Sequence, residues 1–254
     1  KTVIDPNIPP NAGLARPLKV TAEEGTLLNC IHPAAVAGRL SAAQRVVDLI
    51  HGALAESVPE QIAAASNGSC YGINFTGQRP DRSLWVYLET IGGGFGARYN
   101  KDGLDGVHVH LTNTSNLPVE ALEGEYPITV LRYELVDGSG GEGTYRGGMG
   151  LRRVYRAEDT CRVGAGGSRM VSRPWGLQGG LPGASGYCRL LPLVGDPVDH
   201  VRGEVAEGDI IEVVTPGSGG FGPPSGRDPE KVREDVRDEV LTATRAREVY
   251  GLMA

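Results

Sequence analysis

The stretch Glu89-Thr-Ile-Gly-Gly-Gly-Phe-Gly-Ala-Arg-Tyr-Asn-Lys-Asp-Gly-Leu-Asp-Gly-Val-His-Val-His-Leu-Thr-Asn-Thr-Ser-Asn-Leu-Pro-Val-Glu120 joins a predicted strand to a long polar loop. The apolar segment 84–91 runs directly into glycines, carboxylates, asparagines and two histidines. Binding and catalytic groups are commonly carried on loops that a rigid scaffold positions. We therefore expect a strand-rich scaffold that carries a functional loop at this point of the chain.

Glycine dominates the composition of the chain. The 254 residues include 38 glycines and 17 prolines, which together fall just below the ~25–30% typical of low-complexity disorder. The 40% hydrophobic content predicts a folded, turn-rich protein. A net charge of -6 without a basic stripe argues against a nucleic-acid or anionic-membrane partner. No stretch approaches the ~18 apolar residues of a membrane span, and no signal-peptide pattern opens the chain.

Short strand candidates follow one another from residue 70 onward, and glycine clusters separate most of them. They are residues 70–75, 84–91, 128–136, 151–157, 161–165, 186–191 and 210–214. Strands and helices do not alternate regularly, which argues against a doubly wound parallel sheet. We predict a strand-rich α+β fold with mostly antiparallel sheets connected by glycine turns.

A helix is expected over about residues 41–65. Ser41 to Gln44 forms a capping-box pattern at its start. Pro59 interrupts the segment, and residues 60–65 are expected to form another helical turn. Its apolar residues fall at helical spacing and are expected to pack against a sheet; they are Val46, Val47, Ile50 and Leu54.

A charged helical tail is expected over about residues 228–250. Asp228 is the predicted N-cap, Pro229 takes the first helical position, and Thr242 starts a second short helix. We therefore divide the chain into a β-rich region, residues 1–226, and a helical tail, residues 227–254, packed on it.

The cysteines do not form a recognisable metal or disulfide pattern. Cys30, Cys70, Cys161 and Cys188 lie far apart and form no CxxC pair, which excludes zinc-ribbon spacing. Reduced thiols in a cytoplasmic protein are the favoured interpretation.

The loop 92–97 matches the pattern G-x-G-x-x-A of dinucleotide-binding turns. That site also needs a helix N-terminus to hold the pyrophosphate. Residues 98–103 form a turn sequence instead, so tight-turn packing is the favoured interpretation. A related segment, residues 217–222, could also bring backbone close to a ligand or to protein.

His108 and His110 alternate with apolar residues, which on a strand would place both imidazoles on one face. Such a pair could form half of a metal site if carboxylates such as Asp102 or Glu120 came near. Hydrogen-bonded histidines on a half-buried strand are the favoured alternative, because no further ligand spacing supports a metal.

Two further groups could serve a site. Glu120 and Glu123 would share a face of one helical turn, although surface glutamates of this kind are commonly just solvated. Arg146 lies in the glycine-dense loop 137–150 and could bind a carboxylate or phosphate, or could bridge loop carbonyls structurally. No G-x-S-x-G elbow is present, so nucleophilic catalysis is unsupported.

These loops together resemble the hydantoinase B/5-oxoprolinase family, which includes the related large subunit of acetone carboxylase. The resemblance extends in order over nearly the whole chain. It is carried by residues 5–13, 16–17, 89–97, 102–108, 113–120, 123, 139–150, 207–210, 215–222 and 228–251.

The resemblance implies ATP-dependent opening of cyclic amides such as hydantoins, oxoproline and lactams, or the related carboxylation of ketones. It also implies a hydantoinase A-type partner that uses ATP and Mg²⁺, and a divalent metal, Zn or Mn. Subunits of this family are about twice as long as this chain, which resembles their C-terminal half. The resemblance therefore implies that the metal ligands lie in the N-terminal half of such a subunit, and that this half is itself a partner of the chain. We expect the chain to be half of a catalytic subunit and to be inactive alone.

The leading hypothesis is that the chain supplies pocket walls to such an enzyme complex. The expected catalytic groups are Glu89, Asp102, His108 and Glu120, and the expected substrate-binding groups are Gly93, Gly94, Asn113 and Arg146. No metal ligand is assigned to this chain. The alternatives are a non-catalytic assembly module whose glycine loops pack on partner subunits, and an independent metal enzyme built on the two histidines.

Overall fold

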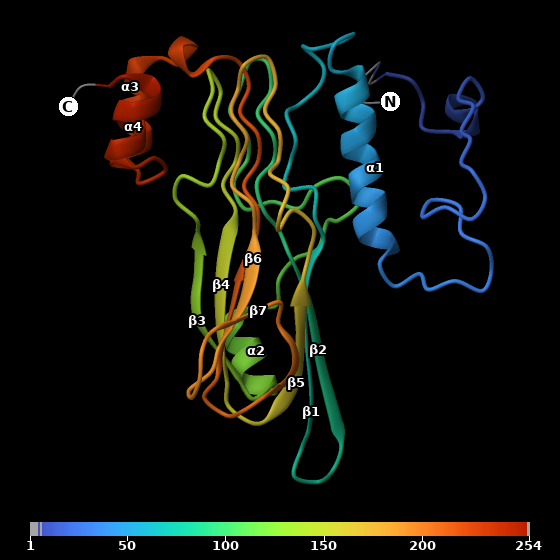
Figure 1. The fold of residues 1–254 in the computed structure, drawn as a ribbon, viewed down its shortest axis with the longest axis vertical. Coiled ribbons are helices and arrows are strands. Elements are labelled where there is room, and N and C mark those ends of the chain that lie inside the picture. Colours follow the sequence, from blue (N-terminus) through green and yellow to red (C-terminus); the bar gives the residue numbers. More distant parts are fainter. Residues whose placement is uncertain (1–4, 6, 253–254) are drawn as a thin grey trace.

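The computed structural model describes residue 5 and residues 7–252. Pro6 of the first motif, and residues 1–4 and 253–254 at the ends of the two expected regions, lie outside it. Figure 1 shows a central body of strands and extended segments, with α1 (Arg39–Leu54) on one side and the tail helices on the other. No helix in the described part of the chain is long and apolar enough to cross a membrane.

The strands form two antiparallel sheets. Within residues 7–252, one sheet has the order β2-β1-β5-β8 and the other has the order β3-β4-β9-β6-β7. The strands of the first sheet are β1 (Tyr71–Gln78), β2 (Leu84–Ile91), β5 (Cys161–Gly166) and β8 (Arg202–Val205). Those of the second are β3 (Ile128–Leu135), β4 (Leu151–Ala157), β6 (Tyr187–Leu191), β7 (Val198–Asp199) and β9 (Ile210–Val214).

The main hydrophobic core lies between these sheets. Alternate residues of β1 face inward, and Tyr71, Ile73 and Phe75 are completely buried. The second sheet contributes residues such as Tyr155 and Ile211 to the same cluster. The period of two along each strand thus produces the packed interior of a sandwich.

The predicted strand-rich α+β fold is confirmed. Each of the seven expected strands is present, with bounds that differ by at most three residues. The sequence did not reveal β7 or β8. β7 is only two residues long, and β8, Arg202-Gly-Glu-Val205, lacks apolar alternation and contains Gly203 with a φ of 147°. None of the cysteines forms a disulfide, and Cys161 and Cys188 are buried.

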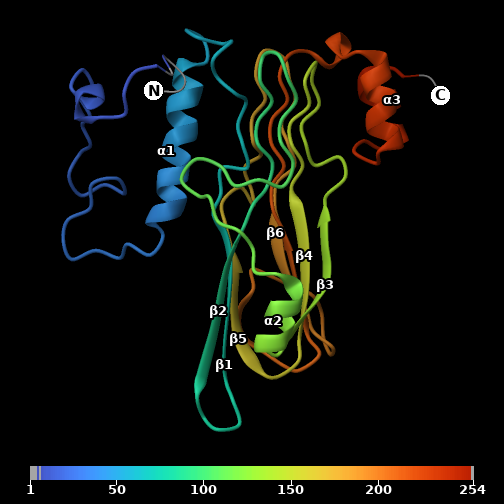
Figure 2. The same ribbon diagram turned by 180° about the vertical axis from the view of Figure 1, so that it is seen from behind.

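A short helix, α2 (Val119–Glu125), lies between β2 and β3, the edge strands of the two sheets (Figure 2). Its Leu122 is fully buried in the main core. The helix thereby closes one open side of the sandwich.

α1 orients its polar side inward, contrary to the sequence prediction. Gln44 and Asp48 are buried, whereas Ile50 is 54% exposed. The other predicted inward residues, Val46, Val47 and Leu54, are half-buried. Residues 62–65 are also not helical, so the expected second helical turn is wrong. The amides of Ala64 and Ala65 instead donate to the carbonyls of other chain segments.

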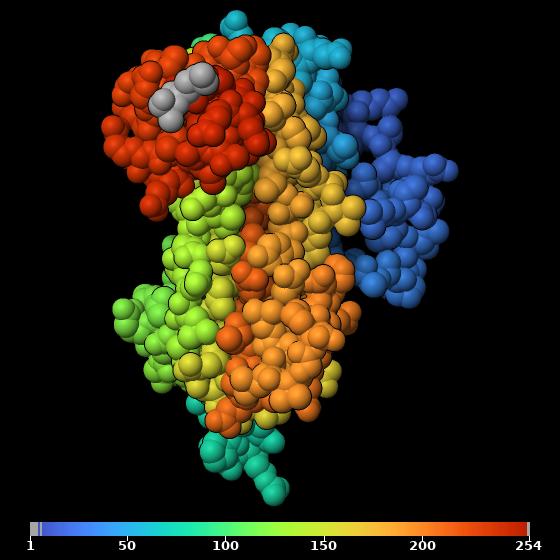
Figure 3. All heavy atoms as spheres, turned by 60° about the vertical axis from the view of Figure 1, so that its left-hand side comes forward, coloured from blue at the N-terminus to red at the C-terminus, as the bar shows by residue number. Residues whose placement is uncertain are grey.

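The tail follows the prediction closely. Asp228 caps α3 (Pro229–Arg237) through a 2.9 Å bond from the Glu230 amide. Thr242 caps α4 (Ala243–Tyr250), which ends at Gly251 with a φ of 67°. Figure 3 shows this tail as a compact mass at the end of the body opposite the projecting tip of the β1–β2 hairpin.

The upper half of the body in Figure 1 is a bundle of extended segments that run side by side outside the regular strands. We call it the glycine bundle; it consists of residues 62–69, 92–97, 102–107, 139–150, 174–186 and 215–222. All residues of segment 215–222 are buried, and the segment exchanges hydrogen bonds with several neighbouring segments. Gly217 and Gly220 donate to segment 174–186, whereas Gly219 donates to Ala65. Hydrogen bonds therefore link the segments in more than one direction, unlike those of a flat sheet.

Glycine makes this packing possible because backbone approaches backbone without an intervening side chain. A Cβ atom on Gly217 would lie less than 3.0 Å from the carbonyl oxygen of Ser139, a separation that real Cβ atoms essentially never show. Gly148 faces the Leu104 carbonyl and Gly96 faces the Ala64 carbonyl in the same way. The high glycine content is thus a packing requirement of the bundle.

We predict that Gly217→Ala destabilises the protein by about 2–3 kcal/mol, because the new methyl group overpacks rigid backbone. Gly124→Ala is the matched control, since a Cβ atom there meets nothing within 4 Å on α2. Alanine in a helix should leave stability unchanged or raise it by up to about 1 kcal/mol. Urea unfolding measures both, and equal stabilities for the two variants would contradict the packing argument.

Candidate functional site

An open groove of about 660 Å³ runs beside β2, between this strand and the segment that leads into α2. Its lining residues are Val86, Tyr87, Leu88, Glu89, Thr90, Thr114, Ser115, Asn116, Leu117, Pro118 and Tyr126. We call it the β2 groove. Its walls combine apolar side chains with hydroxyl and amide groups, a lining suited to a small neutral molecule.

A second groove, of about 710 Å³, lies along β1, β5 and β8 of the first sheet. Arg162, His200 and Arg202 are among its lining residues, and none of the sequence-predicted site residues is. The β2 groove is therefore the stronger candidate for the site that the sequence predicts.

Glu89 lies in the floor of the β2 groove and is only 5% exposed. Its carboxylate accepts hydrogen bonds from the Arg153 guanidinium, the Tyr155 hydroxyl at 2.7 Å and the Asn116 amide at 2.6 Å. Arg153 lies on β4, so this ion pair connects the two sheets. With three donors around it, Glu89 is an anchor for the groove wall in this structure.

Aromatic rings enclose the buried ion pair. The Arg153 guanidinium lies 4.3 Å from the centre of the Tyr133 ring, a favourable cation–π distance. Burial and the negative charge of Glu89 raise the pKa of Tyr155 well above its usual value. Burial, followed by the negative charge of Glu89, raises the pKa of the buried Tyr87 hydroxyl.

Asn116 is the wall residue that sequence reasoning missed. Its amide group donates to Glu89 and to the Thr90 carbonyl at 3.2 Å, and its oxygen accepts from the Tyr133 hydroxyl at 2.7 Å. The available signal was the repeated asparagine in Asn113-Thr-Ser-Asn116. Asn113, the residue chosen from that motif, is exposed and does not line the groove.

His108 connects to the groove through hydroxyl groups. Its Nε2 lies 3.0 Å from the Thr114 Oγ1, which lies 2.5 Å from the Thr90 Oγ1. Burial lowers the pKa of His108, so the imidazole is neutral at pH 7. Of the expected residues, Glu89 thus lines the groove, and His108 lies behind its lining residue Thr114.

His110 faces a different environment, so the prediction that both imidazoles share a strand face is wrong. The segment turns at His110, which has a φ of 56°, and its Nε2 lies 3.0 Å from the Asp48 carboxylate of α1. Asp48 also accepts from Arg45 and, at 2.8 Å, from Arg169. This buried cluster joins α1 to the body.

Burial and two neighbouring arginines keep the His110 imidazole neutral at pH 7. Burial, together with the charges of Arg45 and Arg169, lowers the pKa of His110 to about 4. Burial likewise lowers the pKa of each of these two arginines to about 10, although both remain cationic at pH 7. His51 lies 5.8 Å from His110 between ring centres, and its pKa is lowered by burial as well.

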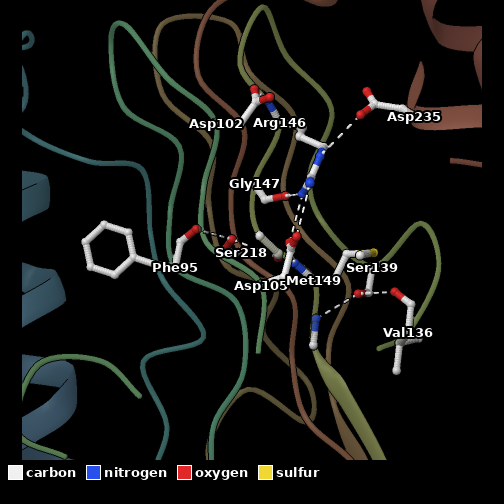
Figure 4. A network of polar contacts seen from close by, with 12 residues as sticks. Phe95, Asp102, Asp105, Val136, Ser139, Arg146, Gly147, Met149, Ser218 and Asp235 are labelled. Atoms are coloured by element: carbon white, nitrogen blue, oxygen red, sulfur yellow. Dashed lines mark hydrogen bonds and ion pairs between the residues drawn. The ribbon is translucent and has the colours of Figure 1, made fainter. Parts of the chain in front are cut away.

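Asp102 and Arg146 belong to an ionic network that joins the glycine bundle to the tail (Figure 4). Arg146 forms bonds of 2.8 and 3.1 Å to Asp105 and lies 3.5 Å from Asp235 of α3. Arg227 bonds both carboxylate oxygens of Asp102, at 2.8 and 3.0 Å, and also pairs with Asp235. Because Arg146 already contacts Asp105 and Asp235, these contacts indicate that it holds protein segments together and does not bind an anionic ligand.

Burial and the arginine charges oppose each other at two carboxylates of the network, and the pKa shifts in opposite directions at the two. Burial alone would raise the pKa of Asp102, but the hydrogen bonds and charge of Arg227 lower it. Burial raises the pKa of Asp235 despite its two arginine neighbours. Asp102 differs from Asp235 in also accepting a 2.8 Å hydrogen bond from the Arg146 amide, which lowers its pKa further.

The remaining expected residues lie away from the groove. Gly93 and Gly94 are buried in the glycine bundle, where a Cβ atom on Gly94 would collide with the Gly148 carbonyl. Glu120 is exposed on α2 and does not line the groove. Its neighbour Glu123 accepts a 2.8 Å bond from the Val130 amide.

A metal centre is not evident in this chain. No group of three or more His, Cys, Asp and Glu side chains within the described residues could hold a metal ion. His108 and His110 point to different partners, so they do not form the two-histidine half of a metal site that their spacing could have provided. The divalent metal implied by the resemblance was expected outside this chain and stays a prediction.

The chain belongs to the Hydantoinase B/oxoprolinase family, whose sequence pattern matches residues 1–224. It is 43% identical over 257 residues to an uncharacterized protein of Methanocaldococcus jannaschii, covering 98% of this chain and 44% of that protein. It is 38% identical to the B-type subunit of a putative D-/L-hydantoinase from a Pseudomonas species, covering 97% of this chain and 42% of that protein.

A solved structure supports the same relationship. The crystal structure of an ATP-dependent caprolactamase from Pseudomonas jessenii aligns with a TM-score of 0.75 and 25% identity, covering 92% of this chain and 43% of that chain. The chain therefore spans less than half the length of these relatives. The resemblance recognised from the glycine-rich loops is confirmed.

We predict that Glu89→Gln lowers the free energy of unfolding by about 3–5 kcal/mol, because it leaves Arg153 charged and buried without a counter-ion. Glu120→Gln is the control and should change stability by less than about 0.5 kcal/mol, because that side chain is exposed. Urea unfolding at pH 7 compares them. A Glu89→Gln protein as stable as the wild type would contradict the role of the ion pair.

His110 predicts a dependence of stability on pH. The unfolded chain binds a proton at His110 near pH 6.5, but the folded chain does so only near pH 4, so stability falls as the pH drops through this window. His110→Asn should reduce that loss, and asparagine tolerates the positive φ. His200→Asn is the matched control, because exposed His200 has a φ of 64°. Thermal unfolding from pH 4 to 7 measures the effect; parallel profiles for His110→Asn and wild type would refute it.

Proposed function

We propose that this chain forms part of a hydantoinase B-type subunit in an ATP-dependent enzyme complex that opens cyclic amides. Family membership over residues 1–224 carries the proposal. A hydantoinase B-type subunit and an ATP-dependent caprolactamase among its relatives support the reaction class. In this proposal a hydantoinase A-type subunit uses ATP and Mg²⁺, and the remainder of the B-type subunit completes the site.

The β2 groove supports a role in binding a neutral ring. Val86, Leu88 and Tyr126 offer apolar contacts, and Ser115 and Thr90 offer hydroxyl groups that can donate to or accept from an amide. A simple lactam presents one carbonyl acceptor and one N–H donor on an apolar ring, and a hydantoin ring presents two of each. Both match this mixed lining.

The buried ion pair supports orientation of that ring. Glu89 fixes Asn116, and Asn116 fixes the backbone at Thr90 on the opposite wall. Such anchoring lowers the entropy cost of holding a substrate in one geometry. His108, held neutral by burial, can relay a proton through Thr114 toward the groove.

We assign no reaction step on this chain to a metal, because its described donor groups do not fit one. Zn or Mn, if the complex uses it, is proposed to bind in the remainder of the B-type subunit. Ketone carboxylation and the cytoplasmic location expected from the sequence both stay predictions.

A chimera tests the proposal. The matched region of the Pseudomonas hydantoinase B-type subunit is replaced by this chain, and the chimeric protein is combined with its A-type partner and ATP. Hydrolysis of a hydantoin, 5-oxoproline and caprolactam is then measured, with carboxylation of acetone as the alternative reaction. We expect ATP-dependent hydrolysis of at least one cyclic amide. Absence of hydrolysis in a folded, assembled complex would refute the proposal.

Within that chimera, Ser115→Leu should lower kcat/KM about 10- to 100-fold, because the larger side chain fills the groove. Ser172→Leu is the matched control, since Ser172 is exposed and does not line the β2 groove. Wild-type activity in the Ser115→Leu variant would exclude this groove as the substrate site.

A further inference from the structure

The outer face of α1 is apolar and exposed. Leu49 and Ile50 are 68% and 54% exposed, whereas Gln44 and Asp48 on the same helix are buried. Leu40, at the start of the helix, is 45% exposed. The bonds of Asp48 to Arg169 and His110 fix this orientation. The helix therefore holds its apolar residues outward by means of a buried ionic anchor.

The segment that precedes α1 also exposes apolar side chains. Its large exposed residues are Leu18, Val20, Leu27, Leu28, Ile31 and Val36. Figure 1 shows this segment in blue beside α1, at the side of the molecule away from the tail helices. We call the exposed apolar residues of 18–50 the N-terminal apolar surface.

Charge is scarce on this surface after residue 24. Lys19, Glu23 and Glu24 are exposed at its start, whereas between residues 25 and 50 the charged residues are Arg39, Arg45 and Asp48, and the last two belong to the inward cluster under α1. Depletion of charge is typical of the core of a permanent protein–protein interface. A membrane-binding helix would carry lysines and arginines on its polar face, and here that face is buried.

We propose that the N-terminal apolar surface is the docking surface for the remainder of a hydantoinase B-type subunit. This inference rests on the proposed function and assigns the contact surface within it. The relatives indicate which protein segment would cover this surface. This chain covers only 42% of the Pseudomonas protein, so more than half of that protein lies outside the match and can dock here. In the Pseudomonas protein the matched region and the remainder share one chain, so the remainder has a high effective concentration, which favours it over a second copy of this chain.

Side-chain footprinting with a photogenerated carbene tests the assignment. Labelling is compared between the isolated chain and the chimera in which this chain replaces the matched region of the Pseudomonas protein. We expect labelling of Leu28, Leu49 and Ile50 to fall roughly fivefold in the chimera, as expected for residues moved into an interface core. Val171 and Val194, 95% and 92% exposed elsewhere, are the controls and should keep their labelling.

Unchanged labelling of the three residues in a folded chimera would overturn the proposal. Protection already present in the isolated chain, together with the mass of a dimer by light scattering, would overturn it in favour of a second copy. Neither readout needs turnover. A protected surface in an inactive complex would refute the proposed reaction while leaving the docking assignment intact.

Variants provide a second measurement. Leu49→Glu combined with Ile50→Lys should leave the Tm of the isolated chain unchanged, because both residues are exposed there. In the chimera it should lower Tm by about 5 °C or more, because both charges enter an apolar contact. Val194→Glu is the control and should have no effect in either protein. Equal effects of the double variant in both proteins would contradict the docking assignment.

Discussion

Close contact between backbones in the glycine bundle is the constraint on which the rest of the structure depends. The central segment 215–222 hydrogen-bonds to several other segments, and its glycines leave no room for a Cβ atom at positions such as Gly217. The bundle continues directly from the sandwich, since segment 92–97 follows β2 and segment 215–222 follows β9. Its packing therefore sets where the strands begin and where their loops can lie.

Buried charge determines how the peripheral elements attach to this body. Asp48 fixes α1, Asp102 and Arg227 fix the tail, and Glu89 with Arg153 joins the two sheets. A buried charge without its partner is costly, so each cluster specifies one arrangement of its elements. The sequence suggested reactive roles for Glu89 and Asp102. In the structure both position chain segments, and the β2 groove follows from the position of Glu89.

The strands and the tail helices could be predicted because their signals are local. Alternating apolar residues identified β2, and Asp228 with Pro229 identified the start of α3. The orientation of α1 could not be predicted, because hydrophobic spacing assigned Ile50 to the interior while an ionic cluster from distant segments buried Asp48 instead. Asn116 was missed for a similar reason, since its importance arises from contacts with β2 and β3.

The sequence by itself determined the strand-rich class, the family and the glycine-dense loops, because periodicity and ordered motifs are properties of the linear chain. Only the tertiary structure decided which polar residues share a site. It placed Glu89 in the β2 groove with His108 behind its lining residue Thr114, His110 under α1, and Arg146 against the tail. The reason is physical: each of these side chains meets its partner through the folding of the chain, and burial determines whether the resulting charge binds a ligand or holds the fold together.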